Sequence, residues 1–195
     1  MGYSPRVEEA LRVAFRLHAH QHRKSEPGLP YATHLAHVAM IVQAYGFPED
    51  VVIAALLHDT IEDTSYTREK LLRDFGAKVC GIVLEVTEDK SLRWDERKAR
   101  YIAHMRTASF EARAVCCADK LHNLSTLQEG MRRKGMLLWR AFSRGPERTL
   151  RFYEDVYEAL RTGWDHPMLR EYAAVLDEAR RQWSKSGRAS WRERV

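Results

Sequence analysis

Apolar side chains recur every three or four residues along much of this chain, which is the spacing of one helix face. The first such segment covers residues 7–17 and extends towards Gln21, and a second covers 31–46. The intervening SEPGLP stretch (25–30) carries two prolines and a glycine, which predicts a loop. After Pro48, the segment DVVIAALLHDTIEDT begins with an almost continuous apolar run, which indicates a helix buried on most sides.

The pattern predicts helices in the rest of the chain as well. Thr67 is a suitable N-cap for a short helix that ends at Phe75, because Gly76 interrupts the pattern. Further helices are expected over residues 78–86, 94–106, 111–127, 136–142, 147–161 and 168–183. The chain shows no convincing pair of strands and no internal repeat, so the pattern predicts an all-α fold.

The chain's 195 residues, with 45% hydrophobic and 30% charged side chains, suit one globular domain, which we expect to span residues 1–183. The final segment, SKSGRASWRERV (184–195), loses apolar periodicity and gains serine and arginine, which predicts a flexible basic tail. No apolar run has the length of a membrane span, and the first residues lack the apolar stretch of a signal peptide. A cytoplasmic location without a membrane partner is therefore expected.

The net charge of +5 does not identify the class of partner, because much of the excess positive charge lies in arginine-rich segments after Met131 and in the tail. A basic surface suits nucleic acid, but anionic small substrates fit equally well. The three cysteines, Cys80, Cys116 and Cys117, form no even framework, so reduced and buried thiols are expected.

The polar end of the buried helix carries the first candidate chemistry. His58 and Asp59 are adjacent, and Glu62 and Asp63 each follow four residues later, so the two pairs lie one helical turn apart on a common side. Several like charges are costly to bury, so the cluster needs a cation, a proton or exposure to water. A divalent metal would resolve the conflict, whereas a solvated helix end with capping residues is the ordinary alternative.

Two further residues complete a candidate ligand set. His34 lies just inside the second helix, and Asp119 interrupts the apolar run AVCCADKL. Together with His58 and Asp59 they offer a set of nitrogen and oxygen donors that suits Mn, Fe or Zn better than Ca. Each also has an ordinary alternative, because His34 could be a satisfied histidine near a helix start and Asp119 a partner of Lys120 or of an arginine.

The order His34, His58-Asp59, Asp119 resembles the signature of the HD superfamily of metal-dependent phosphohydrolases. Between about residues 8 and 128 the chain is also similar, in order and spacing, to the hydrolase domain of the RelA/SpoT alarmone enzymes and to its stand-alone small relatives of the metazoan SpoT homologue type. Six motifs carry this resemblance: HRKSEPGLPYATH, AALLHDTIEDT, FGAKV, VTEDKSL, ERK and ADKLHNL. An isolated HD dipeptide is weak evidence, but six ordered motifs are strong.

The resemblance implies a compact HD-domain helical bundle that hydrolyses the 3′-pyrophosphate of guanosine tetra- or pentaphosphate, giving GDP or GTP and pyrophosphate. It places Glu62 and Asp63 beside the attacking water. It also implies a divalent transition metal, most readily Mn²⁺ with Zn²⁺ or Fe²⁺ as alternatives. The residues that it assigns to the metal are His34, His58, Asp59 and Asp119.

The same motifs imply a set of substrate-binding residues. Arg23, Lys24 and Ser25 match the RKS stretch at the nucleotide site, where a flat guanidinium can stack on a purine and a lysine can meet charge. Asn123 and Thr126 match family positions near the ribose. The loop before the second helix and the last motif are therefore expected to bind one nucleotide together.

A basic segment with Lys90, Arg97 and Lys98 matches one that lies near the phosphates in the small hydrolases. A solvated helix face is an alternative for Arg97 and Lys98. Arg148 is a further candidate phosphate contact. The relatives usually carry a tyrosine one turn after that arginine, but here Phe152 occupies the position with Tyr153 beside it.

Two rival functions are compatible with parts of this pattern. An HD phosphohydrolase acting on another nucleotide, such as a phosphatase for the 2′-phosphate of NADPH, would use the same metal centre. A catalytically dead module could instead hold a nucleotide or nucleic acid through its positive charge, but all six metal and water residues are present. We therefore expect an enzyme whose partner is a small guanine nucleotide rather than nucleic acid.

Overall fold

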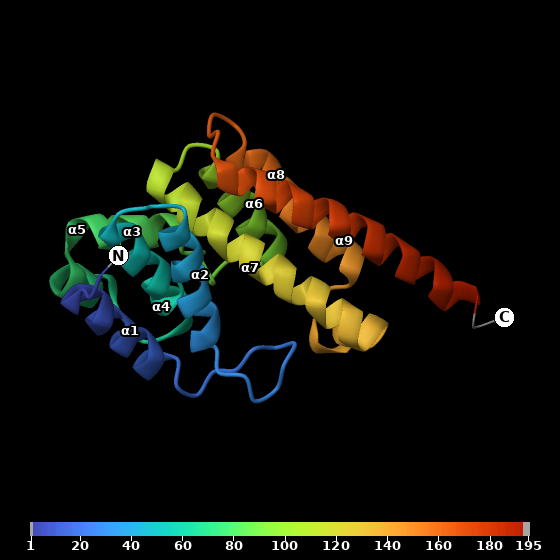
Figure 1. Ribbon diagram of the computed structural model, residues 1–195, viewed down its shortest axis with the longest axis horizontal. Coiled ribbons are helices and arrows are strands. Elements are labelled where there is room, and N and C mark those ends of the chain that lie inside the picture. The colour runs from blue at the N-terminus through green and yellow to red at the C-terminus, as the bar shows by residue number, and fades with distance from the viewer. Residues whose placement is uncertain (1, 193–195) are drawn as a thin grey trace.

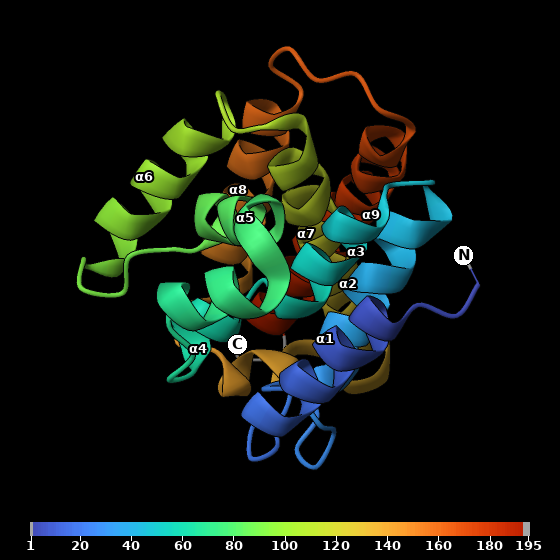
Figure 2. The same ribbon diagram turned by 90° about the vertical axis from the view of Figure 1, so that its left-hand side faces the viewer.

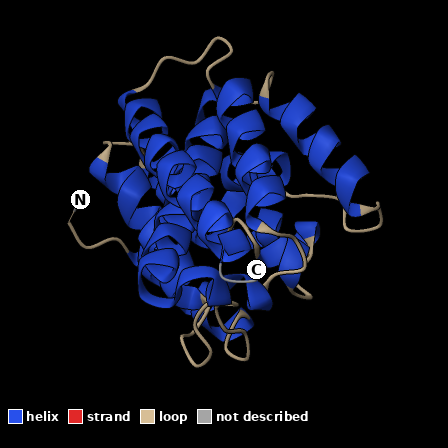
Figure 3. Cartoon of the chain, turned by 90° about the vertical axis from the view of Figure 1, so that its right-hand side faces the viewer, coloured by secondary structure: helices blue, strands red, loops and turns tan. Residues whose placement is uncertain are grey.

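The computed structural model describes residues 2–192, with side chains described up to Trp183. Regular structure in this range is helical, apart from an isolated bridge between His22 and Pro30. The elements are α1 (Pro5–Leu17), α2 (Ala32–Ala44), α3 (Glu49–Leu57), α4 (Thr60–Asp63), α5 (Arg68–Val86), α6 (Trp94–Met105), α7 (Phe110–Lys134), the 3-10 helix η1 (Gly135–Ala141), α8 (Pro146–Leu160) and α9 (Pro167–Arg192). The predicted all-α fold is confirmed (Figure 3).

Helix α7 runs through the centre of the bundle (Figures 1 and 2). It packs against α2, α3, α5, α8 and α9, and α3 in turn packs against α1, α2 and α5. Every residue of α3 from Val51 to Leu57 is buried, as the continuous apolar run predicted. Full burial of one such side chain stabilises the fold by roughly 1.5–3 kcal/mol. Helix α3 therefore holds the polar turn that follows it in one position.

Short polar residues begin several helices where the sequence places them. Ser4, Thr67 and Ser109 each accept a backbone N–H from the first turn of their own helix, an interaction that contributes roughly 1 kcal/mol. Gly76 has a φ of 86° inside α5, a left-handed conformation that favours glycine. The predicted interruption at Gly76 is confirmed, because α5 consists of two helical segments joined at this kink.

The segment after α3 differs from the continuous helix that the sequence predicts. Helix α3 ends at Leu57, and His58 and Asp59 lie in a turn before α4. The His58 Nδ1 atom lies 2.7 Å from the carbonyl oxygen of Ala55, and the Thr60 hydroxyl donates to the carbonyl of Leu57 at 2.6 Å. The helix is interrupted because these side chains occupy carbonyls that would otherwise accept backbone N–H groups four residues later.

The C-terminal helices are longer than the sequence predicts. Helix α7 continues through Lys134 and leads directly into η1. Helix α9 continues through Arg192, although its predicted end is Trp183. The expected tail, residues 184–195, thus has a helical backbone up to Arg192, its last three residues lie outside the described part, and its flexibility stays a prediction. No helix of the described part combines the length and apolar character needed to cross a membrane.

Candidate metal centre and adjoining cavity

Four side chains from three parts of the fold converge, and we call them the ligand cluster. His34 comes from the first turn of α2, His58 and Asp59 from the turn between α3 and α4, and Asp119 from the middle of α7. The Nε2 atom of His34 lies 3.2 Å from Oδ1 of Asp119 and 3.9 Å from Oδ2 of Asp59. The Nε2 atom of His58 lies 3.2 Å from Oδ2 of Asp59 and 3.9 Å from Oδ1 of Asp119. The sequence-predicted ligands are therefore neighbours in space.

The ligand cluster has the properties of a cation site. The Nε2 atoms of His34 and His58 are buried and have no hydrogen-bond partner. His58 Nδ1 contacts the carbonyl of Ala55, which places the ring proton on Nδ1 and leaves Nε2 free as a donor of electrons. His34 Nδ1 lies 2.8 Å from Nδ1 of His122, which allows the same arrangement. Two imidazole nitrogens with two carboxylates suit a divalent transition metal.

The electrostatics of the ligand cluster also favour positive charge. Burial alone lowers the pKa of His58, but the adjacent Asp59 carboxylate outweighs burial and raises that pKa to about 9. Burial works against ionisation of Asp119, yet the charge of Lys120 and the neighbouring histidines hold its pKa well below the usual range. Burial lowers the pKa of His34. In the absence of another cation the carboxylates thus retain a proton on His58, with which a metal would compete.

Further polar contacts orient the members of the ligand cluster. Tyr31 donates its hydroxyl proton to Oδ2 of Asp59 at 2.5 Å. Asp119 accepts hydrogen bonds on both oxygens, from Lys120 at 2.6 Å and from Asn123 at 2.5 Å. Contacts of this kind fix the direction of a metal ligand and tune its affinity. Asp119 is therefore both a partner of Lys120, as the alternative interpretation predicted, and a member of the ligand cluster.

Tyr31 and His122 contact members of the ligand cluster, although no role for either follows from the sequence pattern. Both lie three residues from a predicted ligand, Tyr31 before His34 and His122 after Asp119. A spacing of three residues puts side chains on neighbouring positions of one helix face. That spacing is the signal that could have identified them, although it does not show that His122 would meet His34 across 88 positions of sequence.

Glu62 and Asp63 lie on α4, beside the ligand cluster. One Glu62 carboxylate oxygen accepts the backbone N–H of Glu88 at 3.1 Å, and burial raises the pKa of the Glu62 carboxyl group. Asp63 forms an ion pair with Lys90. Both acids line a polar pocket of about 150 Å³ together with His58, Asp59 and Asp119. A carboxylate with a raised pKa is a stronger base, which suits removal of a proton from water.

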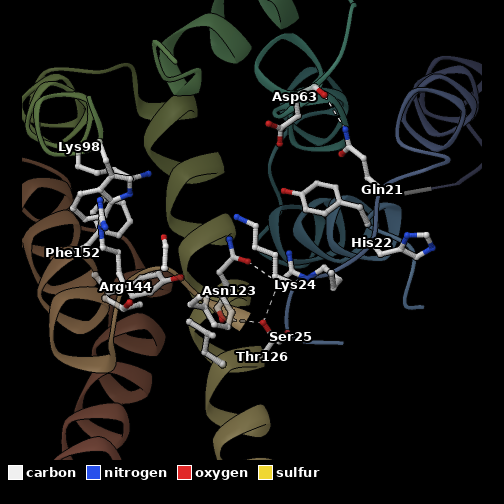
Figure 4. A pocket seen from close by; sticks show the side chains of 18 residues that line it. Gln21, His22, Lys24, Ser25, Asp63, Lys98, Asn123, Thr126, Arg144 and Phe152 are labelled. Atoms are coloured by element: carbon white, nitrogen blue, oxygen red, sulfur yellow. Dashed lines mark hydrogen bonds between the residues drawn. The ribbon is translucent and has the colours of Figure 1, made fainter. Parts of the chain in front are cut away.

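A larger cavity of about 580 Å³ adjoins this polar pocket. Tyr31, Asp63 and Asn123 line both spaces, so the two share a border. The volume falls within the range of small-molecule sites. We divide the lining of this cavity into the loop end (Arg23, Lys24 and Ser25), the middle (Asn123 and Thr126) and the far end (Trp94, Lys98, Arg144 and Phe152). In Figure 4, Lys98, Arg144 and Phe152 lie across Asn123 and Thr126 from Lys24 and Ser25.

The loop end and the middle are in direct contact. Arg23 donates to Oδ1 of Asn123 at 2.8 Å and to the hydroxyl of Thr126 at 3.2 Å. Its guanidinium carbon also lies 5.7 Å from the centre of the Tyr31 ring. Residues that the sequence assigns to different parts of a nucleotide thus form one connected surface. Lys24 is exposed, and Ser25 is buried in the lining.

The predicted basic segment is divided between two acids. Lys98 lines the larger cavity and pairs with Glu88 at 2.5 Å. Arg97 pairs with the same carboxylate at 3.2 Å, and Lys90 pairs with Asp63. Of the described residues, neither Arg97 nor Lys90 is among those that line the two cavities. Phosphate contacts from these three side chains stay a prediction.

At the far end, Arg144 lines the cavity, whereas Arg148, the predicted phosphate contact, does not. Arg148 pairs with Asp95, and its guanidinium carbon lies 4.9 Å from the centre of the Trp94 ring, outside the cavity lining. Arg144 lies 5.2 Å from the same ring and does line the cavity. A phosphate contact by Arg148 stays a prediction.

Phe152 and the adjacent Tyr153 both reach the cavity. Phe152 and Tyr153 are part of its lining, and the ammonium group of Lys98 lies 4.5 Å from the Phe152 ring centre. Phe152 thus presents a ring face, without a hydroxyl group, to the ammonium group of Lys98. An ammonium group over such a face is held electrostatically.

The sequence pattern of the HD domain family matches residues 10–144. The chain belongs to this family. Its membership implies dependence on a divalent metal, in agreement with the buried His34, His58 and Asp59 group, whose ligand atoms all lie within 4.8 Å of one another. The resemblance that the six sequence motifs carry is confirmed at the level of the family.

Individual relatives are similar to much of this chain. The guanosine-3′,5′-bis(diphosphate) 3′-pyrophosphohydrolase MESH1 of Drosophila melanogaster is 42% identical over 127 residues, which cover 64% of this chain and 71% of that protein. A solved structure of a metazoan ortholog of SpoT that hydrolyses ppGpp has a TM-score of 0.79 and 32% identity, over 91% of this chain and 97% of that one. The Listeria monocytogenes protein lmo0812 has a TM-score of 0.70 and 35% identity, over 73% of this chain and 96% of that one.

Proposed function

We propose that this protein is a metal-dependent hydrolase that removes the 3′-pyrophosphate of guanosine tetra- and pentaphosphate, releasing GDP or GTP and pyrophosphate. The observation that carries the proposal is the ligand cluster at the border of the larger cavity, with two buried imidazole nitrogens that lack hydrogen-bond partners. The similarity to ppGpp hydrolases in both sequence and structure supports the choice of substrate.

The four members of the ligand cluster would hold the metal, and we propose Mn²⁺ because mixed nitrogen and oxygen donors suit it. A bound divalent cation lowers the pKa of a coordinated water and stabilises negative charge on a phosphoryl oxygen. Tyr31 keeps the Asp59 carboxylate oriented through its 2.5 Å hydrogen bond. Asn123 and Lys120 do the same for Asp119.

Glu62 is the proposed acceptor of the proton from the attacking water. Its partly buried carboxyl group has a raised pKa and accepts the backbone N–H of Glu88, so it is both more basic and fixed in direction. Asp63, paired with Lys90, lines both cavities and would orient the attacking water, which displaces the 3′ oxygen of the ribose from phosphorus. No covalent intermediate is required for this reaction.

The loop end would bind the guanine base. Hydrogen bonds to Asn123 and Thr126 hold the planar Arg23 guanidinium in one position, where it can stack on a purine. Lys24 supplies a positive charge and Ser25 a hydroxyl group. Asn123 contacts both Arg23 and Asp119, so a ribose beside it would lie between the base site and the ligand cluster. Lys98, together with Lys90, Arg97 and Arg148, would supply positive charge towards the phosphates.

The test uses the purified full chain, stripped of metal and reloaded with Mn²⁺, Zn²⁺, Fe²⁺ or Ca²⁺. We expect guanosine tetraphosphate to yield GDP and pyrophosphate with Mn²⁺, and Ca²⁺ to support no turnover. The rival 2′-phosphatase activity would instead release orthophosphate from NADPH with comparable or better efficiency. Absence of pyrophosphate in the Mn²⁺ reaction would show that the proposed substrate is wrong, even if metal binding is retained.

A further inference from the structure

His18 is a fully buried histidine at the C-terminal end of α1, and the proposed reaction does not use it. Its Nε2 atom has no hydrogen-bond partner among the described residues, and its Nδ1 atom lies 2.7 Å from Oε1 of Gln21. An apolar side chain of similar size would fill the same space without the cost of removing a polar ring from water. The hydrogen bond to Gln21 is therefore what a histidine provides here and an apolar residue would not.

Gln21 connects His18 to the end of α4. Its Nε2 atom donates to the backbone carbonyl of Asp63 at 2.9 Å, a contact drawn in Figure 4. A carbonyl oxygen can only accept, so the NH₂ end of the amide faces Asp63 and the oxygen end faces His18. The Nδ1 atom of His18 is consequently a donor, which places a ring proton on that nitrogen. The three groups form one chain of hydrogen bonds that runs from His18 to Asp63.

The backbone of Gln21 is also held at both of its polar groups. Its N–H donates to the carbonyl of His18 at 3.0 Å, and its carbonyl accepts the N–H of Tyr31 at 2.8 Å. The ring of His18 stacks on the ring of Tyr31, with the ring centres 5.4 Å apart. The amide of Gln21 therefore reaches Asp63 from a fixed position between the end of α1 and the start of α2.

Helix α4 depends on such contacts because it is a single turn. Within the described part of the chain, α5 is the helix that packs extensively against it. The last carbonyls of a helix lack donors within that helix, and the Asp63 carbonyl receives its donor from Gln21. A second tether is the backbone N–H of Glu88, which the Glu62 carboxylate accepts. The turn that carries both proposed water-handling acids is thus held from two separate parts of the chain.

We propose that His18 is a positioning residue for the hydrolysis, which fixes the place of Asp63 through the amide of Gln21. This inference rests on the proposed function. Of the described side chains at this end of α1, Gln21 borders the larger cavity and His18 lines neither cavity, so His18 acts through Gln21. A misplacement of about 1 Å near the reacting atoms can cost roughly a hundredfold in rate. Loss of the His18 hydrogen bond should accordingly slow the chemical step and spare the binding of nucleotide and metal.

The first experiment separates the hydrogen bond of His18 from its packing. His18→Phe keeps a ring against Tyr31 but cannot donate to Gln21, whereas His18→Asn keeps a donor near the Nδ1 position and leaves space unfilled. We expect His18→Phe to lower kcat for guanosine tetraphosphate about tenfold or more, with KM and Mn²⁺ affinity within about twofold. His18→Asn should recover most of that kcat, although it should unfold at a lower temperature than His18→Phe. His20→Phe, at an exposed position just after α1, is the matched control and should behave like the unaltered enzyme.

The second experiment needs no substrate. Amide hydrogen exchange of the full chain should be about fivefold or more faster in α4 of His18→Phe, for example at the Asp63 N–H that donates to the Asp59 carbonyl, because one supporting hydrogen bond is lost. Exchange in α3 and α7 should not change. Gln21→Met should have at least the same effect, and adding His18→Phe to it should cause no further increase, since both changes break the same chain of hydrogen bonds.

Each other outcome has a definite meaning. A kcat that follows thermal stability, with His18→Asn below His18→Phe, would overturn the inference, because His18 would then only fill space. An unchanged kcat in His18→Phe would overturn it as well. If the unaltered enzyme releases no pyrophosphate from guanosine tetraphosphate, the proposed function is wrong, and hydrogen exchange alone then decides whether His18 fixes Asp63. Unchanged exchange in α4 of His18→Phe would refute the positioning role in either case.

Discussion

The ligand cluster and the far end of the cavity are built in opposite ways. The histidines and Asp119 of the cluster are buried. The cluster residues come from α2, from the turn after α3 and from α7, and hydrogen bonds fix their direction. The far end is made of partly exposed side chains from α6, α8 and the loop before α8. Its cations Lys98 and Arg144 lie over aromatic rings, and Arg144 forms no ion pair with an acid in the described part of the chain.

This difference indicates which regions of the protein tolerate amino-acid substitutions. Removing one partner from a buried charged group costs about 3–5 kcal/mol, because the remaining charge is left uncompensated. Replacing a partly exposed charged residue costs about 1 kcal/mol or less in stability. Substitutions in the ligand cluster should therefore abolish the reaction, whereas substitutions along the cavity should change binding alone.

The largest effect is expected from Asp59→Ala, which removes one of the two anionic members of the ligand cluster. Loss of a residue that only hydrogen-bonds to a metal ligand typically weakens metal binding by about tenfold to a hundredfold. In Asp59→Ala, Mn²⁺ binding measured by calorimetry should weaken by more than this, and turnover should disappear. Asp155→Ala, at an exposed position on α8, is the control and should behave like the unaltered protein. Unchanged Mn²⁺ binding in Asp59→Ala would refute the assignment of the metal site.

Glu62→Gln is expected to lower kcat about a hundredfold, the usual contribution of a residue that transfers a proton. Glutamine keeps the volume of the side chain and an oxygen that can accept the Glu88 N–H. Calorimetry should accordingly find the same Mn²⁺ affinity as in the unaltered enzyme. Full activity in this variant would remove Glu62 from the mechanism.

His122→Ala should weaken Mn²⁺ binding by about tenfold to a hundredfold, because His34 loses the contact that holds its Nδ1 proton. His122→Asn should recover much of that loss, since the amide oxygen can occupy the place of the His122 Nδ1 acceptor. Turnover of the alanine variant should return at saturating Mn²⁺. A merely structural role of His122 predicts instead that both variants lose thermal stability with no difference in metal affinity.

The smallest of the four effects is expected from the double replacement of Arg23 and Lys24 by glutamine. Steady-state kinetics should show KM for guanosine tetraphosphate raised roughly tenfold, with kcat changed by less than about threefold, because these contacts are equal in ground and transition states. Mn²⁺ affinity should be unaffected. A loss of kcat comparable to that of Glu62→Gln would break the distinction between the two regions.

Much of the fold could be predicted from the sequence because its signals are local. Apolar periodicity located most helices, and Ser or Thr caps and Gly76 located several of their ends. The break between α3 and α4 was missed, because it depends on side-chain hydrogen bonds from His58 and Thr60 to backbone carbonyls. Composition predicted the end of α9 at Trp183, but the backbone remains helical through Arg192.

By itself, the sequence determined the all-α class through its apolar periodicity, and its resemblance to the HD superfamily predicted which residues form the ligand cluster. Only the tertiary structure decided how distant residues meet. It brought His122 into contact with His34 and paired both Arg97 and Lys98 with Glu88. It also placed Arg144, rather than Arg148, in the cavity lining. The physical reason is that periodicity specifies which face of a helix is buried, whereas the contacts made across that face depend on how the helices pack.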